Sequence, residues 1–519
     1  MRKLKLPIGI QTFEKMRNDG YAYVDKTDFV ASLARDGTYF FLSRPRRFGK
    51  SLFVDTLDCA FSGRRELFAG LYLDSSESGW DWSRKHPVIR VSFGSGTYRS
   101  PEALADYLEM IFGEQAEKLN LESLTGKTAA LQLRELIRQV HERDGVGAVV
   151  LFDEYDKPIL DNLENPEVAI AMREELKSLY SVLKDCDPWL RFVFLTGVSK
   201  FAKAGIFSGL NNLNDITINA RYSAICGYTQ TDLETVFADR LEGLDLEAVR
   251  SWYNGYAWTG EAVYNPFDVL LHLDERKFKA FWFETGTPTF LVKLLGEKPR
   301  CLPELEGLVV GEELLGSFRI EDLAPETLLF QAGYLTIKNS SSDPVRGTRY
   351  TLGFPNREVR QAFNALMLGV LTAGPADATG RLDRLYDVMD AGDTEALRAV
   401  VHSFFASIPN DWYRRNRISE FEGYYASVVY AYFASLGYEV LPEDVTNRGR
   451  IDLTVKTHTG IWIFEFKVKG LDRSGDRSPM AQLRERGYAE KYRADGRSVR
   501  QVGIVFDPET RNIDVWETD

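Results

Sequence analysis

The chain has 519 residues, of which 44% are hydrophobic and 27% are charged, and its formal net charge is −12. Because this length exceeds what one hydrophobic core usually organises, we expect two or three domains. The negative charge excludes a protein that coats nucleic acid nonspecifically over its whole surface, so any contact with DNA or RNA must be local.

The sequence pattern predicts neither a signal peptide nor a membrane span. The first residues include lysines and arginines but no continuous apolar run, and no window approaches about 18 consecutive apolar residues. We therefore expect a soluble, cytoplasmic protein that does not contact a membrane. Four widely spaced cysteines without CxxC spacing are expected to be buried free thiols: Cys59, Cys186, Cys226 and Cys301.

Residues 37–55 contain an apolar, β-forming run, a basic loop and Gly-Lys-Ser at the start of a helical pattern. This order predicts a phosphate-binding P-loop, in which backbone N–H groups and a helix N-terminus surround the phosphates. Lys50 would reach the β- and γ-phosphates, and the Ser51 hydroxyl would bind Mg²⁺. Arg44 replaces the first glycine of the usual GxxxxGK[ST] pattern. The candidate nucleotide-binding residues of this loop are Arg47, Gly49, Lys50 and Ser51.

An apolar run at 147–156 ends in paired carboxylates and predicts a Walker B strand. Asp153 would hold Mg²⁺ through water, and Glu154 would polarise the attacking water. A buried strand followed by a solvated acidic turn is the alternative, and it would suit Asp156 and Lys157.

Strands and helices alternate through this half of the chain. We predict strands at 88–93 and 191–200 and helices near 101–118, 127–143 and 166–184. This alternation predicts an α/β fold with a mostly parallel sheet whose ligand lies at the carboxyl ends of its strands. Thr196 and Ser199, at the end of one strand, are candidate sensors of the γ-phosphate.

Several short motifs form a recognisable set: YVDKT at 23–27, RPRRFGKSL at 44–52, LFDEYDKP at 151–158, TGVSKF at 196–201, WYNGY at 252–256 and YNPF at 264–267. Together they resemble a bacterial and archaeal family of AAA-ATPase-like proteins that typically carry a C-terminal PD-(D/E)xK nuclease domain. The resemblance implies ATP as the nucleotide, and modules of this type often form homo-oligomers. Arg221 is a candidate arginine finger between subunits, although a structural salt bridge is the simpler role.

The chain is expected to divide into three parts, at 1–270, 271–400 and 401–519. The first is the AAA-type P-loop domain. The second has helical patterns and is predicted to be a helical lid or spacer, with two strands around a polar turn at 336–352.

Residues 449–469 read as a β-hairpin, because two alternating apolar runs flank Thr-His-Thr-Gly. If the turn is centred between His458 and Thr459, Asp452 lies directly opposite Glu465, and Lys467 shares their face. One face is then filled by Ile451, Leu453, Val455, Trp462, Phe464 and Phe466.

Opposed carboxylates repel each other, and a bound divalent cation removes this penalty. Asp452 and Glu465 would bind Mg²⁺ or Mn²⁺, helped by the Phe466 carbonyl, and Lys467 would position or deprotonate the attacking water. The arrangement matches the PD-(D/E)xK pattern. An ordinary amphipathic edge with solvated charges is the alternative interpretation of the same residues.

The surrounding elements complete a restriction-endonuclease-like αβββαβ order. A helix and strand at 419–443 precede the hairpin, and Glu422 on that helix matches an additional acidic position of the family. The segment 481–493, with Gln482, Tyr488 and Lys491, resembles the helix that follows ExK, and 502–507 supplies a closing strand.

Two functions remain open at this stage. The first is a metal-dependent nuclease, acting on DNA in preference to RNA and possessing an ATP-binding module that gates it. The second is an ATP-dependent switch or scaffold whose C-terminal domain binds nucleic acid or protein without cutting.

Overall fold

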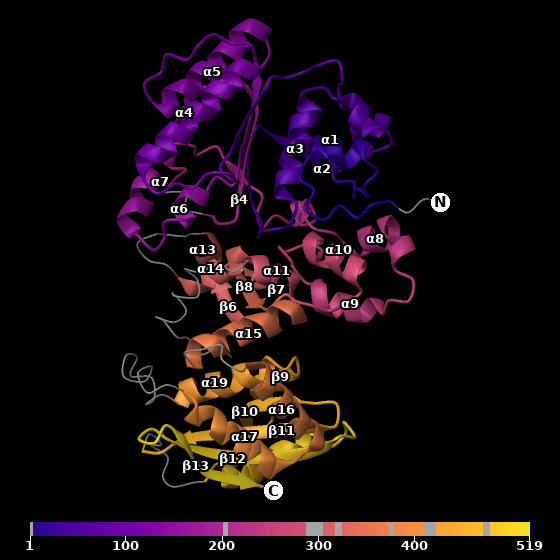
Figure 1. The fold of residues 1–519 in the computed structure, drawn as a ribbon, viewed down its shortest axis with the longest axis vertical. Helices are drawn as coiled ribbons and strands as arrows, with labels where there is room; N and C mark the ends of the chain where they lie inside the picture. The colour runs from indigo at the N-terminus through magenta and orange to yellow at the C-terminus, as the bar shows by residue number, and fades with distance from the viewer. Residues whose placement is uncertain are drawn as a thin grey trace. The chain divides into compact units, whose positions relative to one another are not determined.

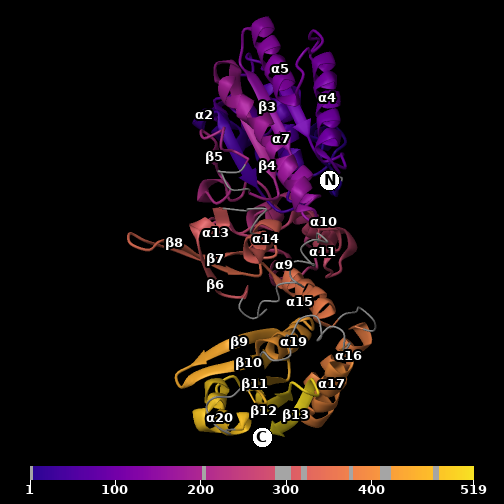
Figure 2. The same ribbon diagram turned by 90° about the vertical axis from the view of Figure 1, so that its left-hand side faces the viewer.

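A computed structural model describes residues 4–200, 206–286, 305–316, 324–372, 378–408, 422–470 and 478–519 (Figures 1 and 2). The chain folds as two compact units, Met1–Gly286 with Val309–Asn356 and Thr287–Leu308 with Arg357–Asp519. The division at 270 and 400 stays a prediction. Cys186 and Cys226 are buried free thiols as predicted, whereas the free thiol Cys59 is only partly buried, and Cys301 lies outside the described residues.

A five-stranded sheet lies at the centre of the first unit, in the order β2-β3-β4-β1-β5. Its strands pair in parallel throughout, which confirms the predicted parallel sheet. Because parallel strands end at the same edge, the loop after Ser43, the acidic turn after Asp153 and the end of β4 meet there. The strands are β1 (Tyr39–Ser43), β2 (Val88–Ser92), β3 (Ala148–Asp153), β4 (Leu190–Gly197) and β5 (Asn214–Asp215).

Helices pack on this sheet in two groups (Figure 1). Helices α4, α5 and α7 contact one another, while α1 and α2 contact α3. Helices α4 and α5 begin where the sequence predicts, because the Ser100 and Thr128 side chains accept from backbone N–H groups of the first turn. The helices are α1 (Phe13–Asn18), α2 (Thr27–Asp36), α3 (Lys50–Phe61), α4 (Pro101–Lys118), α5 (Ala129–Asp144), α6 (Lys157–Leu160) and α7 (Pro166–Asp185).

The rest of the first unit combines short helices with a three-stranded sheet, ordered β6-β8-β7. The antiparallel pair β7 and β8 lies where two strands are predicted around a polar turn. The elements are α8 (Gln230–Val236), α9 (Leu246–Tyr253), α10 (Pro266–Glu275), α11 (Phe281–Gly286), β6 (Leu308–Gly311), α13 (Glu312–Gly316), α14 (Pro325–Ala332), β7 (Thr336–Asp343) and β8 (Gly347–Gly353).

The second unit contains a five-stranded sheet in the order β13-β12-β11-β10-β9. Strands β9, β10 and β11 are antiparallel neighbours, β11 and β12 are parallel, and β13 adds an antiparallel edge strand beyond the predicted αβββαβ order. The elements are α15 (Arg357–Thr372), α16 (Ala378–Ala391), α17 (Thr394–Ala406), α19 (Glu422–Ala434), β9 (Glu439–Thr446), β10 (Gly449–Lys456), β11 (Gly460–Val468), α20 (Pro479–Arg486), β12 (Ser498–Asp507) and β13 (Asn512–Thr518).

Apolar layers cover both faces of this sheet. Phe464 stacks on Phe433 of α19, while Ile461 and Ile463 pack in the cluster that contains Leu483 of α20. Ile451 also lies in the α20 cluster, so its predicted place beside Trp462 and Phe464 is wrong. Regular β10–β11 pairing starts only at Leu453, so Ile451 lies beyond the paired part of this ladder.

Candidate functional site

The phosphate loop connects β1 to α3 in the first unit. Gly49 immediately precedes α3 with a φ of 91°, and Arg47 has a φ of 67°. A positive φ costs little at glycine but about 1 to 2 kcal/mol at other residues, so the surrounding structure must hold Arg47 in this conformation. The loop is therefore a fixed turn that ends at a helix N-terminus.

Arg44 does not extend toward the loop opening. Its side chain is fully buried, and its guanidinium donates to the backbone carbonyls of Ser43, Thr217 and Tyr222 at 2.8 to 3.0 Å. The Trp258 ring centroid lies 4.0 Å from the guanidinium carbon. Burial lowers the pKa of Arg44 to about 10, which still leaves it charged at neutral pH. This arginine therefore supports the loop from behind.

Lys50 is the first residue of α3 and is buried. Its ammonium donates to the carbonyls of Arg44 and Pro45, each at 2.8 Å. Burial lowers the pKa of Lys50, while the nearby Asp153 and Glu154 carboxylates raise it. The loop carbonyls thus hold the ammonium where the anionic oxygens of a phosphate could replace them.

The acidic turn after β3 contains two buried or half-buried carboxylates. Asp153 is 2% exposed, and its Oδ1 has no hydrogen-bond partner within the described part of the chain. Glu154 follows with a φ of 53°, and burial together with Asp153 raises the pKa of its carboxyl group. A buried carboxylate oxygen without a donor favours a bound cation.

Asp156 is buried rather than solvated, so the alternative interpretation of this turn is wrong for that residue. It is 1% exposed and accepts from the Val198 N–H and from the N–H and hydroxyl of Ser199. Its carboxylate therefore ties the acidic turn to the segment after β4. The sequence signal for this role was only the proximity of Asp156 to the Walker B pair.

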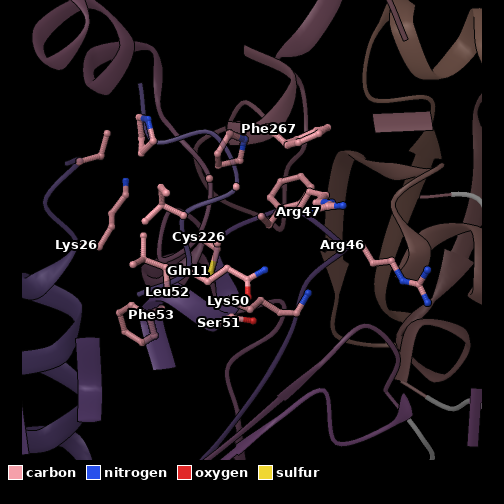
Figure 3. Close-up of a pocket in the computed structure, with 18 of the residues that line it drawn as sticks. Gln11, Lys26, Arg46, Arg47, Lys50, Ser51, Leu52, Phe53, Cys226 and Phe267 are labelled. Atoms are coloured by element: carbon pink, nitrogen blue, oxygen red, sulfur yellow. The ribbon is translucent and has the colours of Figure 1, made fainter. Parts of the chain in front are cut away.

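A cavity of about 430 Å³ opens beside the phosphate loop (Figure 3). Arg47, Gly49, Lys50, Ser51 and Glu154 line it together. Its other walls come from distant segments and are largely apolar. They include Pro7, Ile10, Val24, Cys226, Tyr228, Phe267 and Leu270.

Four residues predicted for this site do not line the cavity, namely Asp153, Thr196, Ser199 and Arg221. Thr196 is fully buried, and its hydroxyl donates to the Leu42 carbonyl at 2.8 Å. Arg221 forms an ion pair with Asp36 and packs over the Tyr222 ring. The side chains of Thr196 and Arg221 are therefore already bonded within the chain.

The hairpin of the second unit has the predicted register. Leu453 pairs with Phe464. Asp452 and Glu465 are the next residues of the two strands on the side away from the turn. At that point the Asp452 Oδ2 accepts from the Phe466 N–H at 2.7 Å. The two carboxylates therefore belong to neighbouring strands at one end of the β10–β11 ladder.

Glu465 is 1% exposed, and its Oε1 accepts from the Gln482 side chain on α20. Tyr488 lies near these two carboxylates. Burial, and then the charges of Glu465 and Asp452, raise the pKa of its phenol. Lys467 is half-buried, two residues farther along β11. Asp452, Glu465, Gln482 and Tyr488 thus converge, and Tyr488 was suggested only by resemblance.

Comparisons with known proteins match the two parts of the chain that contain these residues. Residues 7–207 match the family model described as "Predicted AAA-ATPase", and residues 420–516 match the "PD-(D/E)XK nuclease superfamily". The chain is 49% identical over 517 residues to an "Uncharacterized protein in vnfD 5'region" of Azotobacter chroococcum mcd 1, covering 99% of this chain and 98% of that protein. The chain belongs to this AAA-ATPase-like, PD-(D/E)XK-containing family. No solved structure matches it.

The AAA-ATPase-like and nuclease-superfamily domains usually use a nucleotide and a divalent metal. Asp452 and Glu465 supply oxygen ligands, which suit Mg²⁺ or Mn²⁺, and they fit such an ion as two of its ligands. The described residues contain no group of three or more acidic, histidine or cysteine side chains arranged to hold a metal. Glu422, the predicted additional acid, begins α19, but its side chain lies outside the described part.

Across the described ranges, no helix is both long enough and apolar enough to cross a bilayer.

Proposed function

We propose that this protein binds ATP in its first unit and cleaves DNA with a divalent metal ion in its second, and that the nucleotide gates cleavage. The observation that carries the nuclease proposal is the β10–β11 register, which sets Asp452 and Glu465 on neighbouring strands. Gln482 and Tyr488 from the following helical segment adjoin them.

The cavity beside the phosphate loop supports the nucleotide half of the proposal. Lys50 would bind the β- and γ-phosphates, the Ser51 hydroxyl and Asp153 would hold Mg²⁺, and Glu154 would orient water. Arg47 and the Gly49 backbone would contribute to the phosphate cradle. The orphaned Oδ1 of Asp153 supports a cation at this position.

In the nuclease site, Asp452 and Glu465 would hold Mg²⁺ or Mn²⁺ with the Phe466 carbonyl. Lys467 would orient or deprotonate the attacking water, whose oxygen bonds to phosphorus as the ester P–O bond breaks. The leaving oxygen takes the electron pair and then a proton. A bound metal would stabilise negative charge on the phosphoryl oxygens. Gln482 would keep Glu465 oriented through their hydrogen bond.

Cleavage assays test this proposal directly. Wild-type protein and Asp452→Ala are incubated with plasmid and single-stranded DNA, with Mg²⁺ or Mn²⁺, and with or without ATP. We expect metal-dependent cutting by the wild type only, at a rate that ATP changes. Equal cutting by both proteins would assign the activity to another site or to a contaminant.

An ATP-dependent switch or scaffold is the second candidate function. That function predicts no cleavage of any substrate, together with ATP-dependent binding of nucleic acid or protein that Asp452→Ala does not alter.

Glu154→Gln tests the role of Glu154 as the residue that activates water. We expect ATP to bind with nearly wild-type affinity, because the amide keeps the shape of the side chain, and hydrolysis to slow by about 10²-fold or more. Radiolabelled phosphate release measures the rate. Equal hydrolysis by both proteins would remove Glu154 from the reaction.

The pH dependence of ATP hydrolysis should also reflect the role of Glu154. The ionised carboxylate is the active form of Glu154, and burial followed by Asp153 raises its pKa. Hydrolysis should therefore fall as the pH drops through this raised pKa, at a higher pH than for an exposed glutamate. A profile whose acid limb stays near the ordinary glutamate value would contradict the assignment.

A further inference from the structure

Several cations line the proposed nucleotide cavity, and most are already bonded inside the chain. Lys50 donates to two loop carbonyls, and Lys157 donates to the Gly96 carbonyl and to Asp161. Lys26 forms an ion pair with Asp232 at 2.7 Å. Their charge contributes to the field in the cavity, but their positions are set by these partners.

Arg46 differs from these cations. It is exposed and lines the cavity, and no hydrogen bond or ion pair holds its guanidinium within the described parts of the chain. Its backbone is nevertheless fixed, because the Trp282 Nε1–H donates to the Arg46 carbonyl at 3.2 Å. The loop is packed tightly here, since a Cβ on Gly333 would lie 2.7 Å from the Pro45 side chain. A fixed backbone therefore carries an available guanidinium.

The two neighbouring loop arginines leave in different directions (Figure 3). The Arg47 guanidinium lies 4.9 Å from the centroid of the Phe267 ring. Arg46, Lys50 and Glu154 line the same cavity. Arg46 thus shares this cavity with Glu154, the residue that would orient the attacking water.

We propose that Arg46 contacts the γ-phosphate of a bound nucleoside triphosphate and so distinguishes triphosphate from diphosphate within one subunit. The inference rests on the proposed nucleotide site. The γ-phosphate must lie between Lys50 and the water that Glu154 orients. Arg46 lines the same cavity as these two residues. A long arginine side chain can supply two parallel hydrogen bonds to phosphate oxygens there.

This arrangement removes the need for an arginine from a neighbouring subunit. Arg221, the sequence candidate for that role, is engaged by Asp36 of its own chain. Arg46 supplies the equivalent charge in cis. Discrimination between ATP and ADP is then a property of the isolated chain, independent of whether it forms homo-oligomers.

Calorimetric titration of the full-length protein tests the inference, using the β,γ-imido analogue of ATP and, separately, ADP, each with Mg²⁺. We expect Arg46→Ala to weaken analogue binding about 10- to 100-fold while ADP binding changes by less than about twofold. Arg46→Lys should recover part of the loss. Arg47→Ala should weaken both ligands by a similar factor, and Arg138→Ala, on the exposed face of α5, should change neither.

Each alternative outcome has a distinct meaning. If Arg46→Ala weakens the analogue and ADP equally, the inference is overturned while the nucleotide site stands. If the wild type binds neither ligand, the nucleotide site falls and the inference falls with it. Analogue affinity that rises with protein concentration would assign the γ-phosphate contact to a partner subunit. Should Arg46→Ala fail to fold, Arg46→Gln carries the same comparison.

Discussion

Replacing Glu465 with glutamine is expected to lower metal-dependent DNA cleavage by about a thousandfold, because a metal ligand contributes several kcal/mol of charge stabilisation. The amide oxygen can still accept from Gln482, so the hydrogen bond observed at Oε1 is preserved. Only the negative charge is lost. Since Glu465 is 1% exposed, removing that charge should leave the melting temperature unchanged or raise it.

The measurement compares initial cleavage rates and thermal melting for the wild type, Glu465→Gln and Glu509→Gln. Glu509 is an exposed glutamate between β12 and β13, so its replacement removes the same charge away from the site. The control should cleave at the wild-type rate. Full activity in Glu465→Gln would mean that this carboxylate holds no catalytic metal, whereas loss of activity with a lowered melting temperature would indicate unfolding instead.

The hairpin register was predictable because its determinants are local. Two alternating apolar runs around a short turn allow one pairing that keeps each side chain on its own face, and Leu453 opposite Phe464 confirms it. The same holds for α4 and α5, whose starts are fixed by capping side chains within the first turn. Ile451 was misplaced because it lies beyond the paired part of the β10–β11 ladder, where the neighbouring strand no longer fixes its face.

For the phosphate loop, the position was predictable from nearby residues but the surroundings were not. Its position after β1 follows from a strand, a glycine and a helix start that are adjacent in sequence. The carbonyls of Thr217 and Tyr222 that hold Arg44 lie more than 170 residues away in the chain. Phe267, opposite Arg47, is farther still along the chain, and no spacing rule connects these segments. Only the folded chain reveals what surrounds the loop.

Replacing Arg44 with alanine is expected to destabilise the phosphate loop by about 3 to 4 kcal/mol and to abolish nucleotide binding. The substitution leaves three buried carbonyls without their donor, those of Ser43, Thr217 and Tyr222. It also removes the cation that packs on Trp258 and leaves a void in its place. The backbone that carries Lys50 would then no longer be held in one conformation.

Hydrogen exchange followed by mass spectrometry measures this loss of stability in each segment of the chain separately. Amides of β1 and α3 should exchange about 100- to 1,000-fold faster in Arg44→Ala, since each 1.4 kcal/mol corresponds to a factor of ten. The sheet of the second unit should exchange at the wild-type rate, which separates loop destabilisation from global unfolding. Arg138→Ala, an exposed arginine paired with Glu142, provides the control for loss of an arginine.

Arg44→Gly restores the first glycine of the usual P-loop pattern and therefore tests whether the loop depends on the arginine side chain or only on backbone freedom. If the loop depended only on backbone freedom at this position, the variant would bind nucleotide as well as the wild type does. We expect it to be at least as unstable as Arg44→Ala, since glycine supplies no donor and adds flexibility to the unfolded chain. Arg44→Lys should recover little, because one ammonium cannot reproduce a planar fork that meets three carbonyls and an indole ring. Wild-type binding by Arg44→Gly would instead show that the arginine is dispensable and that the strand, the turn and Gly49 suffice to form the loop.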